Sequence, residues 1–517
     1  MTSVLLLERP GRWRAATAAA LFLLAALPLL PLVLAALRAP GAGVGAAFWR
    51  TFATSAAIAL GASLVGLAFG LPLGVGSALS AFPCRRVALV GVGLPLVVPS
   101  FLWAIGWSVA ASTVTRGPAG CVIVAATTST ALVLFASYAA TLELSRAQLD
   151  AALLAGGEGA RVGRAIHHAW LPAVFAAMLA AVLTLSDPGP GQILGAQTVA
   201  SEILTAFAAQ YDLGLAARQC LILILVVGSL ALPLAWIAGP RFVHAVLARQ
   251  ITAPGVPGGG PLGRTVALGS AAFLVLAVVP PVGALLVPLV GSEPSGVWSS
   301  DHLVLLILGA IDTAARTAGN TLLYAGAAGV LATLLGTVIA LAVGRSPRLR
   351  TAAAGVCIVV FAWPPAASAL GVSYLAATAP AALDFLLRSR FTVCLVPALH
   401  LAPVATVLAL RAMGALPPSW TYAAAIHGLS VPRFLRLVLW PALRPTLGLS
   451  IALVALLASA DAGSVLLLHP PGEASLPLAI FTVMANAPEA AVAALCLVYF
   501  VATMALFAGV LALTSRR

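Results

Sequence analysis

The amino-acid sequence predicts an all-α polytopic membrane protein with about 12 transmembrane helices, arranged as two parallel six-helix repeats. Of the 517 residues, 62% are hydrophobic and only 8% are charged, whereas a soluble domain carries about 25% charged residues. Apolar segments long enough to cross a bilayer recur along the chain, and landmarks of the first half return in the second. This composition excludes a soluble enzyme, a disordered chain and a nucleic-acid-binding domain.

A helix needs about 20 mostly apolar residues to cross a bilayer core ~30 Å thick. The first segment that qualifies follows Arg9, Arg12 and Arg14, but its apolar run is too long for a signal peptide and no small-residue cleavage site follows. We therefore expect it to be a retained helix. The predicted spans lie near 15–37, 52–80, 87–112, 120–143, 173–195, 214–238, 265–292, 318–344, 351–376, 391–413, 442–467 and 490–514.

Arginine placement predicts the orientation of these spans. All 27 basic residues are Arg, and if the N-terminus is cytoplasmic most of them fall in inner loops, while most of the 14 acids fall outside. We therefore expect both termini on the cytoplasmic side of a bacterial inner membrane. The net charge of +13 is then a topology signal that needs no nucleic-acid partner.

The second half of the chain repeats the first with a period of about 270 residues. Thr51 and Gly74 match Thr321 and Gly344, and the acid Asp187 matches Asp461. An even number of spans in each half makes the two copies parallel. The predicted domains are an N-terminal segment with the first helix (1–50), a first transmembrane domain (51–238), a cytoplasmic linker (239–264), a helix and outer loop (265–317) and a second transmembrane domain (318–513).

Two inner loops are longer than the others, one between the fourth and fifth spans and its copy between the tenth and eleventh. In the second loop, Ser419 is a candidate N-cap for a short helix that His427-Gly428 would end. A short helix at the membrane surface, present once in each half, suggests docking to a pair of cytoplasmic partners. An ordinary interfacial connector is the alternative.

The same loops resemble the EAA loop of ABC importer permeases. The second loop has Ala423-Ala424, then Gly428 and Pro441, with Tyr422 in place of the usual Glu. The first loop has the acid, in Asp150-Ala151-Ala152 with Gly156, but its Pro172 is displaced by two to three residues, and an alternative register uses Gly159 with Pro172. We prefer the Asp150 register because it keeps the Asp187 and Asp461 match.

This resemblance implies two type I importer transmembrane domains fused in one chain, as in the ferric-iron and thiamine permeases. It implies two ABC ATPase subunits on the cytoplasmic face, one at each EAA-like loop, and an extracytoplasmic substrate-binding protein. Segments 192–217 and 464–482 look like those of the ferric type, so ferric iron is the expected cargo, with thiamine or phosphonate-type ligands as alternatives. A twelve-helix secondary transporter and a membrane transferase are rival interpretations.

The chain itself offers no catalytic chemistry. It has no Lys and therefore no P-loop, so ATP hydrolysis is expected on separate subunits. The six Cys are far apart, which predicts neither a metal site nor a disulfide framework, and we expect no cofactor. Asp187 and Asp461 are the candidates for the translocation path of a cationic ligand, because ionisable groups within a membrane are costly. The alternative is a helix-end acid that faces outer water or pairs with an Arg.

Overall fold

The computed structural model describes residues 29–38, 44–247, 260–291, 300–484 and 486–515, with the single positions 16, 19, 23 and 27. Within these residues every regular element is helical and no strand occurs, which confirms the all-α fold. The first-half helices are α2 (Leu29–Arg38), α3 (Ala46–Leu79), α4 (Arg85–Val97), α5 (Ser100–Ala110), α6 (Ser112–Thr115), α7 (Pro118–Thr141), α8 (Arg146–Ser186), α9 (Gly189–Leu194), α10 (Val199–Ala208) and α11 (Leu213–Leu247).

The rest of the chain continues in the same way. Its helices are α12 (Pro261–Ala277), α13 (Val279–Ala284), α14 (Val287–Gly291), α15 (Ser300–Val343), α16 (Pro347–Ala362), α17 (Pro365–Thr378), η2 (Ala381–Leu383), α18 (Asp384–Leu387), α19 (Arg390–Ala415), α20 (Pro418–Ile426), α21 (Val431–Phe434), the π-helical η3 (Leu435–Leu439), α22 (Trp440–Ser459), α23 (Ala462–Leu468), α24 (Leu476–Met484) and α25 (Glu489–Ser515).

The described residues contain 9 helices long and apolar enough to cross a membrane, or up to 11 if each of two bent pairs is one span. Large apolar side chains also cover the outside of the bundle: Leu60 and Leu64 on α3 are 62% and 57% exposed, and Trp236 on α11 is 85% exposed. Water would disfavour so much exposed apolar surface. The chain is therefore a polytopic membrane protein.

Two predicted spans, 87–112 and 351–376, are not straight helices. The first is α4 and α5, bent by 102°, and the second is α16 and α17, bent by 73°. Each bend falls at a proline, Pro99 or Pro364, and the residue before it is extended: Val98 has ψ 131° and Trp363 has ψ 145°. Proline removes a helix hydrogen bond and forces the preceding residue out of the α region, so each helix ends there.

Other predicted boundaries also shift. The expected outer-loop residues 300–317 are helical and extend α15 to 44 residues, helped by the i,i+4 ion pair between Arg316 and Asp312 at 2.7 Å. α11 continues to Leu247, into the predicted linker. Residues 248–259 of that linker lie outside the described residues. Of the predicted first span 15–37, the structure describes 29–37 and the single positions 16, 19, 23 and 27.

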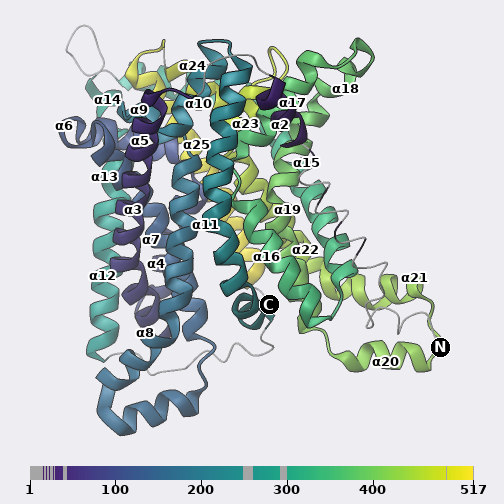
Figure 1. The fold of residues 1–517 in the computed structure, drawn as a ribbon. Helices are drawn as coiled ribbons and strands as arrows, with labels where there is room; N and C mark the ends of the chain where they lie inside the picture. Colours follow the sequence, from purple (N-terminus) through teal and green to yellow (C-terminus); the bar gives the residue numbers. More distant parts are fainter. Residues whose placement is uncertain are drawn as a thin grey trace.

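The long helices form two groups side by side (Figure 1): α3, α7 and α8 in one, and α15, α19 and α22 in the other. Glycines allow the closest approaches within each group. A Cβ at Gly66 would overlap Ser129 on α7, and a Cβ at Gly336 would lie 2.5 Å from the backbone nitrogen of Thr406 on α19. Such small-residue contacts are typical of helix packing in membranes, where backbones approach closely.

Each group also receives a helix from the other part of the chain. α2 packs against α17 and α11, and α12 and α13 pack against α4 and α5. Helices from each half of the chain therefore pack against helices of the other half, and α11 also packs directly on α16.

Candidate functional site

The first EAA-like segment is a short helix that forms the start of α8. Ser145 caps it: its hydroxyl accepts from the backbone N–H of Gln148 at 3.3 Å, and the Gln148 side chain accepts from the Ser145 N–H at 3.2 Å. Leu149, 3% exposed, anchors this helix to the bundle, while Asp150 is exposed. Leu154 is 89% exposed and points away from the core.

Two glycines end this short helix. Gly156 has φ −162°, and Gly157 has φ 72° with ψ −164°, a backbone conformation that favours glycine. The residue with positive φ is therefore Gly157, one position after the glycine of the EAA-like pattern, Gly156. Gly159 is helical, so the alternative register has no break at its glycine. Asp150, Ala151 and Ala152 all precede the break, and Pro172 lies farther along the same α8, inside the helix.

The second EAA-like segment is α20. Its N-cap is Pro417, not the predicted Ser419, because Pro418 already occupies the first helical turn. Ala424, 4% exposed, packs with Phe434, Leu439 and Leu443 in one apolar cluster. The helix ends at Ile426, and Gly428 with φ 65° terminates it, as predicted.

The α20 segment is fixed to the bundle on one side and open on the other. The Arg345 guanidinium at the end of α15 donates to the Leu416 carbonyl at 2.7 Å. A cavity of about 40 Å³ lies beneath, lined by residues such as Trp420 and Thr421. On the open side Ile426 is 82% exposed, Tyr422 and Ala423 are exposed, and Pro441, also exposed, opens α22.

The two short helices lie at the same end of the molecule (Figure 1), where the start of α8 and the α20–α21 segment both project beyond the long helices. Asp150 and Leu154 in one correspond in spacing to Tyr422 and Ile426 in the other. Each segment thus carries one strongly exposed aliphatic side chain just before a glycine break.

Asp187 and Asp461 occupy matching places in the two halves. Each follows the long helix that comes after a projecting segment, α8 or α22. Asp187 ends α8, and its Oδ1 accepts from the Gly189 N–H at 2.9 Å. Asp461 follows α22 and caps α23, with Oδ1 accepting from the Ser464 N–H at 3.0 Å. Both are half-buried, and the two carboxyl groups lie within electrostatic range of each other.

The sequence also allowed an Arg partner for these acids. Among the described residues, no ion pair includes Asp187 or Asp461. Asp187 instead lines a cavity of about 60 Å³ together with Ser100, Thr128 and Thr184. The residues described hold no cluster of three or more His, Cys, Asp or Glu that could bind a metal ion.

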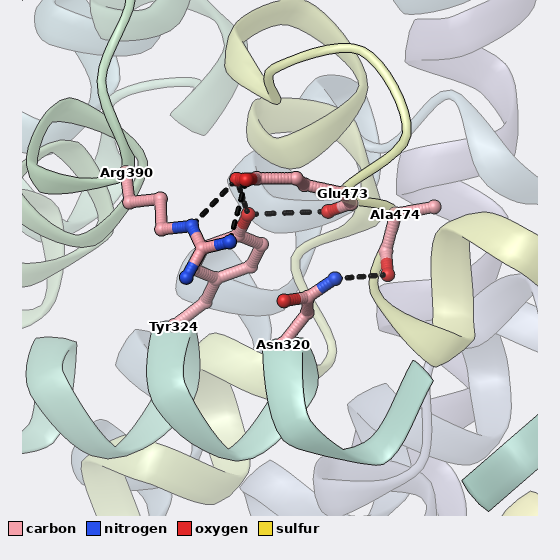
Figure 2. A network of polar contacts seen from close by, with 5 residues as sticks. All are labelled: Asn320, Tyr324, Arg390, Glu473 and Ala474. Atoms are coloured by element: carbon pink, nitrogen blue, oxygen red, sulfur yellow. Dashed lines mark hydrogen bonds and ion pairs between the residues drawn. The ribbon is translucent and has the colours of Figure 1, made fainter. Parts of the chain in front are cut away.

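A polar network that the sequence did not reveal ties the start of α19 to the loop before α24 (Figure 2). Arg390 forms a bidentate ion pair with Glu473, with Nε to Oε2 at 2.7 Å and Nη2 to Oε1 at 2.6 Å. The Tyr324 hydroxyl on α15 donates toward Glu473, 3.1 Å from its carbonyl oxygen, and Asn320 Nδ2 donates to the Ala474 carbonyl at 3.4 Å.

The charge of Arg390 favours the ionised form of the Glu473 carboxyl group. Hydrogen bonding from Arg390 lowers the pKa of Glu473 below its ordinary value. Arg390 and Glu473 lie 83 positions apart in the chain. Arg390 begins the apolar helix α19, whereas Glu473 lies in the loop before α24, so no local sequence signal pairs them. The only hint was the isolated acid in the apolar stretch after Asp461.

Comparison of the chain with models of protein families, with curated proteins and with solved structures finds no match.

Proposed function

We propose that this chain is the membrane-spanning permease of an ATP-driven ABC importer, with two type I transmembrane domains fused in one polypeptide. Its two projecting helices, residues 146–155 and α20, would each dock one ABC ATPase subunit on the cytoplasmic face. An extracytoplasmic binding protein would deliver the cargo to the opposite end. The chain supplies the path through the lipid bilayer, and ATP hydrolysis takes place on the partner subunits.

The observation that carries this proposal is the matched pair of projecting segments. Leu154 and Ile426 are 89% and 82% exposed, and each precedes a glycine with positive φ, Gly157 or Gly428. A single exposed aliphatic residue has no special meaning, but two at corresponding positions of two projecting helices form a repeated surface. Two copies of one soluble subunit would fit such a surface.

Similar contacts, shifted by about one helical turn in the repeat register, support two parallel repeats. The N–H that opens α10, from Val199, donates to the Ser55 hydroxyl on α3 at 2.8 Å, and the N–H that opens α24, from Leu476, donates to the Thr321 hydroxyl on α15 at 2.8 Å. The bent pairs α4–α5 and α16–α17 recur in the same order. A pseudo-twofold relation would give the two ATPase subunits equivalent docking sites.

The cargo rests on the resemblance alone. Segments 192–217 and 464–482 favour ferric iron, and thiamine and phosphonate-type ligands are the alternatives. Because the binding protein would carry the iron, the permease itself needs no metal ligands for this role. Asp187 and Asp461, which lie within electrostatic range of each other, are the proposed acidic positions on the path.

Site-specific photo-cross-linking tests the proposal. A photoreactive residue replaces Leu154 or Ile426 in native membranes, and the cross-linked partner is identified by peptide mass spectrometry. We expect both positions to capture the same protein, with a P-loop among its peptides. The same probe at Leu60, on the apolar outer surface of α3, is the control and should capture lipid or nothing. A secondary transporter would capture no ATPase at either position, which would overturn the proposal.

A further inference from the structure

The cavity beside Asp187 has the chemistry of a cation site, and this holds whatever energy source drives transport. Its volume is about 60 Å³, enough for a few water-sized groups, since one water needs roughly 10–15 Å³ of such space. α3, α5, α7, α8 and α9 all contribute to its lining, with Asp187 at the bend between α8 and α9.

The hydroxyl groups of Ser100, Thr128 and Thr184, which line this cavity, already donate their protons in hydrogen bonds. Thr184 Oγ1 donates to the Ala180 carbonyl at 2.8 Å, and Thr128 Oγ1 donates to the Pro95 carbonyl at 3.4 Å. The Ser100 hydroxyl hydrogen-bonds to the Asp187 carboxylate. A hydroxyl has one proton and two lone pairs. The oxygens of these three lining residues therefore keep lone pairs that can accept, and such acceptors attract a cation.

The glycines of α9 leave room for the polar groups beside them. A Cβ at Gly189 would lie 3.2 Å from both Asp187 Oδ1 and Ser100 Oγ, and a Cβ at Gly191 would lie 2.7 Å from Thr198 Oγ1. The Asp187 carboxylate and the Ser100 hydroxyl therefore converge beside Gly189, where a side chain would displace them.

The charges favour a single positive charge at this place. The cavity lining contains one carboxylate and no basic residue among the described residues, and Asp461 adds negative potential from the second helix group. A carboxylate in a largely apolar surrounding needs a compensating charge. One carboxylate with neutral oxygens suits a monovalent ion, whereas calcium takes six to eight oxygens, usually with several carboxylates.

We propose that Asp187, Ser100, Thr128 and Thr184 bind one small monovalent cation, which holds the bend between α8 and α9. The ligands are the Asp187 carboxylate and the hydroxyl oxygens of α5, α7 and α8. The proposal does not depend on the importer assignment, because the site is complete within this chain.

Equilibrium binding of radioactive sodium, and of radioactive rubidium in place of potassium, to the purified full-length chain tests this. Choline chloride keeps the ionic strength constant. We expect saturable binding of at least one of these ions to the native chain, and a loss of more than about tenfold in affinity for Asp187→Asn. Asp312→Asn removes an exposed carboxylate on α15 and is the matched control, which should bind as the native chain does.

A second pair of variants keeps the test sharp if Asp187→Asn folds poorly. Thr184→Ser retains the hydroxyl oxygen and should retain binding, whereas Thr184→Val keeps the shape, loses the oxygen and should weaken binding several-fold. Saturable binding that is equal in native, Asp187→Asn and Thr184→Val chains overturns the proposal. So does the absence of saturable binding for both ions, the result expected if only a proton occupies Asp187.

Discussion

The two helix groups follow one plan but differ in chemistry at the end opposite the projecting helices. In the first group α7 begins at Pro118, and the neighbouring Gly117 N–H donates to the Leu194 carbonyl at 2.6 Å, a bond between backbone groups only. In the second group α19 begins at Arg390, which forms its ion pair with Glu473. The first group has the cavity lined by Asp187 near this end, and the second has the ion pair between Arg390 and Glu473.

This difference shows which features the shared plan determines. Three kinds of feature occur in both halves, because backbone sterics and apolar packing determine them. They are the bends at Pro99 and Pro364, the close approaches at Gly66 and Gly336, and the short helices before Gly157 and Gly428. The polar contacts at the opposite end depend on single residues, and they differ between the two groups. The two groups therefore offer matched positions at which each effect can be measured separately.

The largest expected effect is on partner docking. With the photoreactive residue moved to the exposed positions 150 and 422, Leu154→Asp and Ile426→Asp should each reduce cross-linking to the proposed ATPase partner by at least about tenfold. Buried aliphatic anchors dominate interface energies, and a carboxylate would be desolvated there. Leu154→Met and Ile426→Val keep apolar surface and should dock as the native chain does. The measurement is cross-link yield at unchanged membrane insertion. A large loss for one variant alone would mean that the two groups do not dock equivalent partners.

The second effect is on backbone strain at the helix breaks. Gly157→Ala and Gly428→Ala should each destabilise their segment by about 1–2 kcal/mol, because an L-residue resists these conformations. No atom lies within 4 Å of the added Cβ at either position or at Gly159, so only the backbone decides. Gly159→Ala, inside the helix, should be neutral or stabilising. Thermal unfolding in detergent compares the three, and equal shifts at Gly157 and Gly159 would contradict the assigned break.

A smaller effect is expected from the Arg390–Glu473 ion pair. Arg390→Ala should lower the thermal midpoint only slightly, by about 1–2 °C, because an exposed ion pair is screened by solvent. It should also raise the cleavage rate of the loop at residues 470–475 under limited proteolysis. The charge reversal Arg390→Glu with Glu473→Arg should restore protection. Protection unchanged in Arg390→Ala would show that backbone packing alone holds the loop.

The smallest expected effect is a pH dependence of the stability that the Arg390–Glu473 ion pair contributes. The pKa of Glu473 is lowered in the folded protein, so the stabilisation is present above the ordinary carboxyl pKa and is lost as pH falls through the folded-state pKa. Melting curves from about pH 6 down to about pH 3 should show a steeper acid-side decline for the native chain than for Glu473→Gln. Parallel curves would mean that Glu473 contributes nothing in this range.

The sequence predicted the elements that apolar patterning and glycine or proline positions control. It placed the long helices, the stop at Gly428 and the matched acids Asp187 and Asp461. It took α4–α5 and α16–α17 as straight spans because their composition is apolar throughout, although Pro99 and Pro364 carried the signal for the bends. It gave Gly156 as the glycine of the first EAA-like loop, and only the dihedral angles show that Gly157 has the positive φ.

The polar contacts could not be predicted because they join distant parts of the chain. Arg390 meets Glu473 only once α19 and the loop before α24 are packed side by side. The cavity at Asp187 similarly needs five helices to assemble before its hydroxyl groups converge. Hydropathy patterns carry no information about either arrangement.

The stoichiometry of the native complex tests the central claim most directly. The chain is extracted from its own membrane in lipid nanodiscs and weighed by native mass spectrometry. We predict one chain of 52.0 kDa with two copies of one P-loop ATPase, and loss of both copies in the variant that combines Leu154→Asp with Ile426→Asp. A chain that transports its cargo while carrying no ATPase subunit would contradict the account.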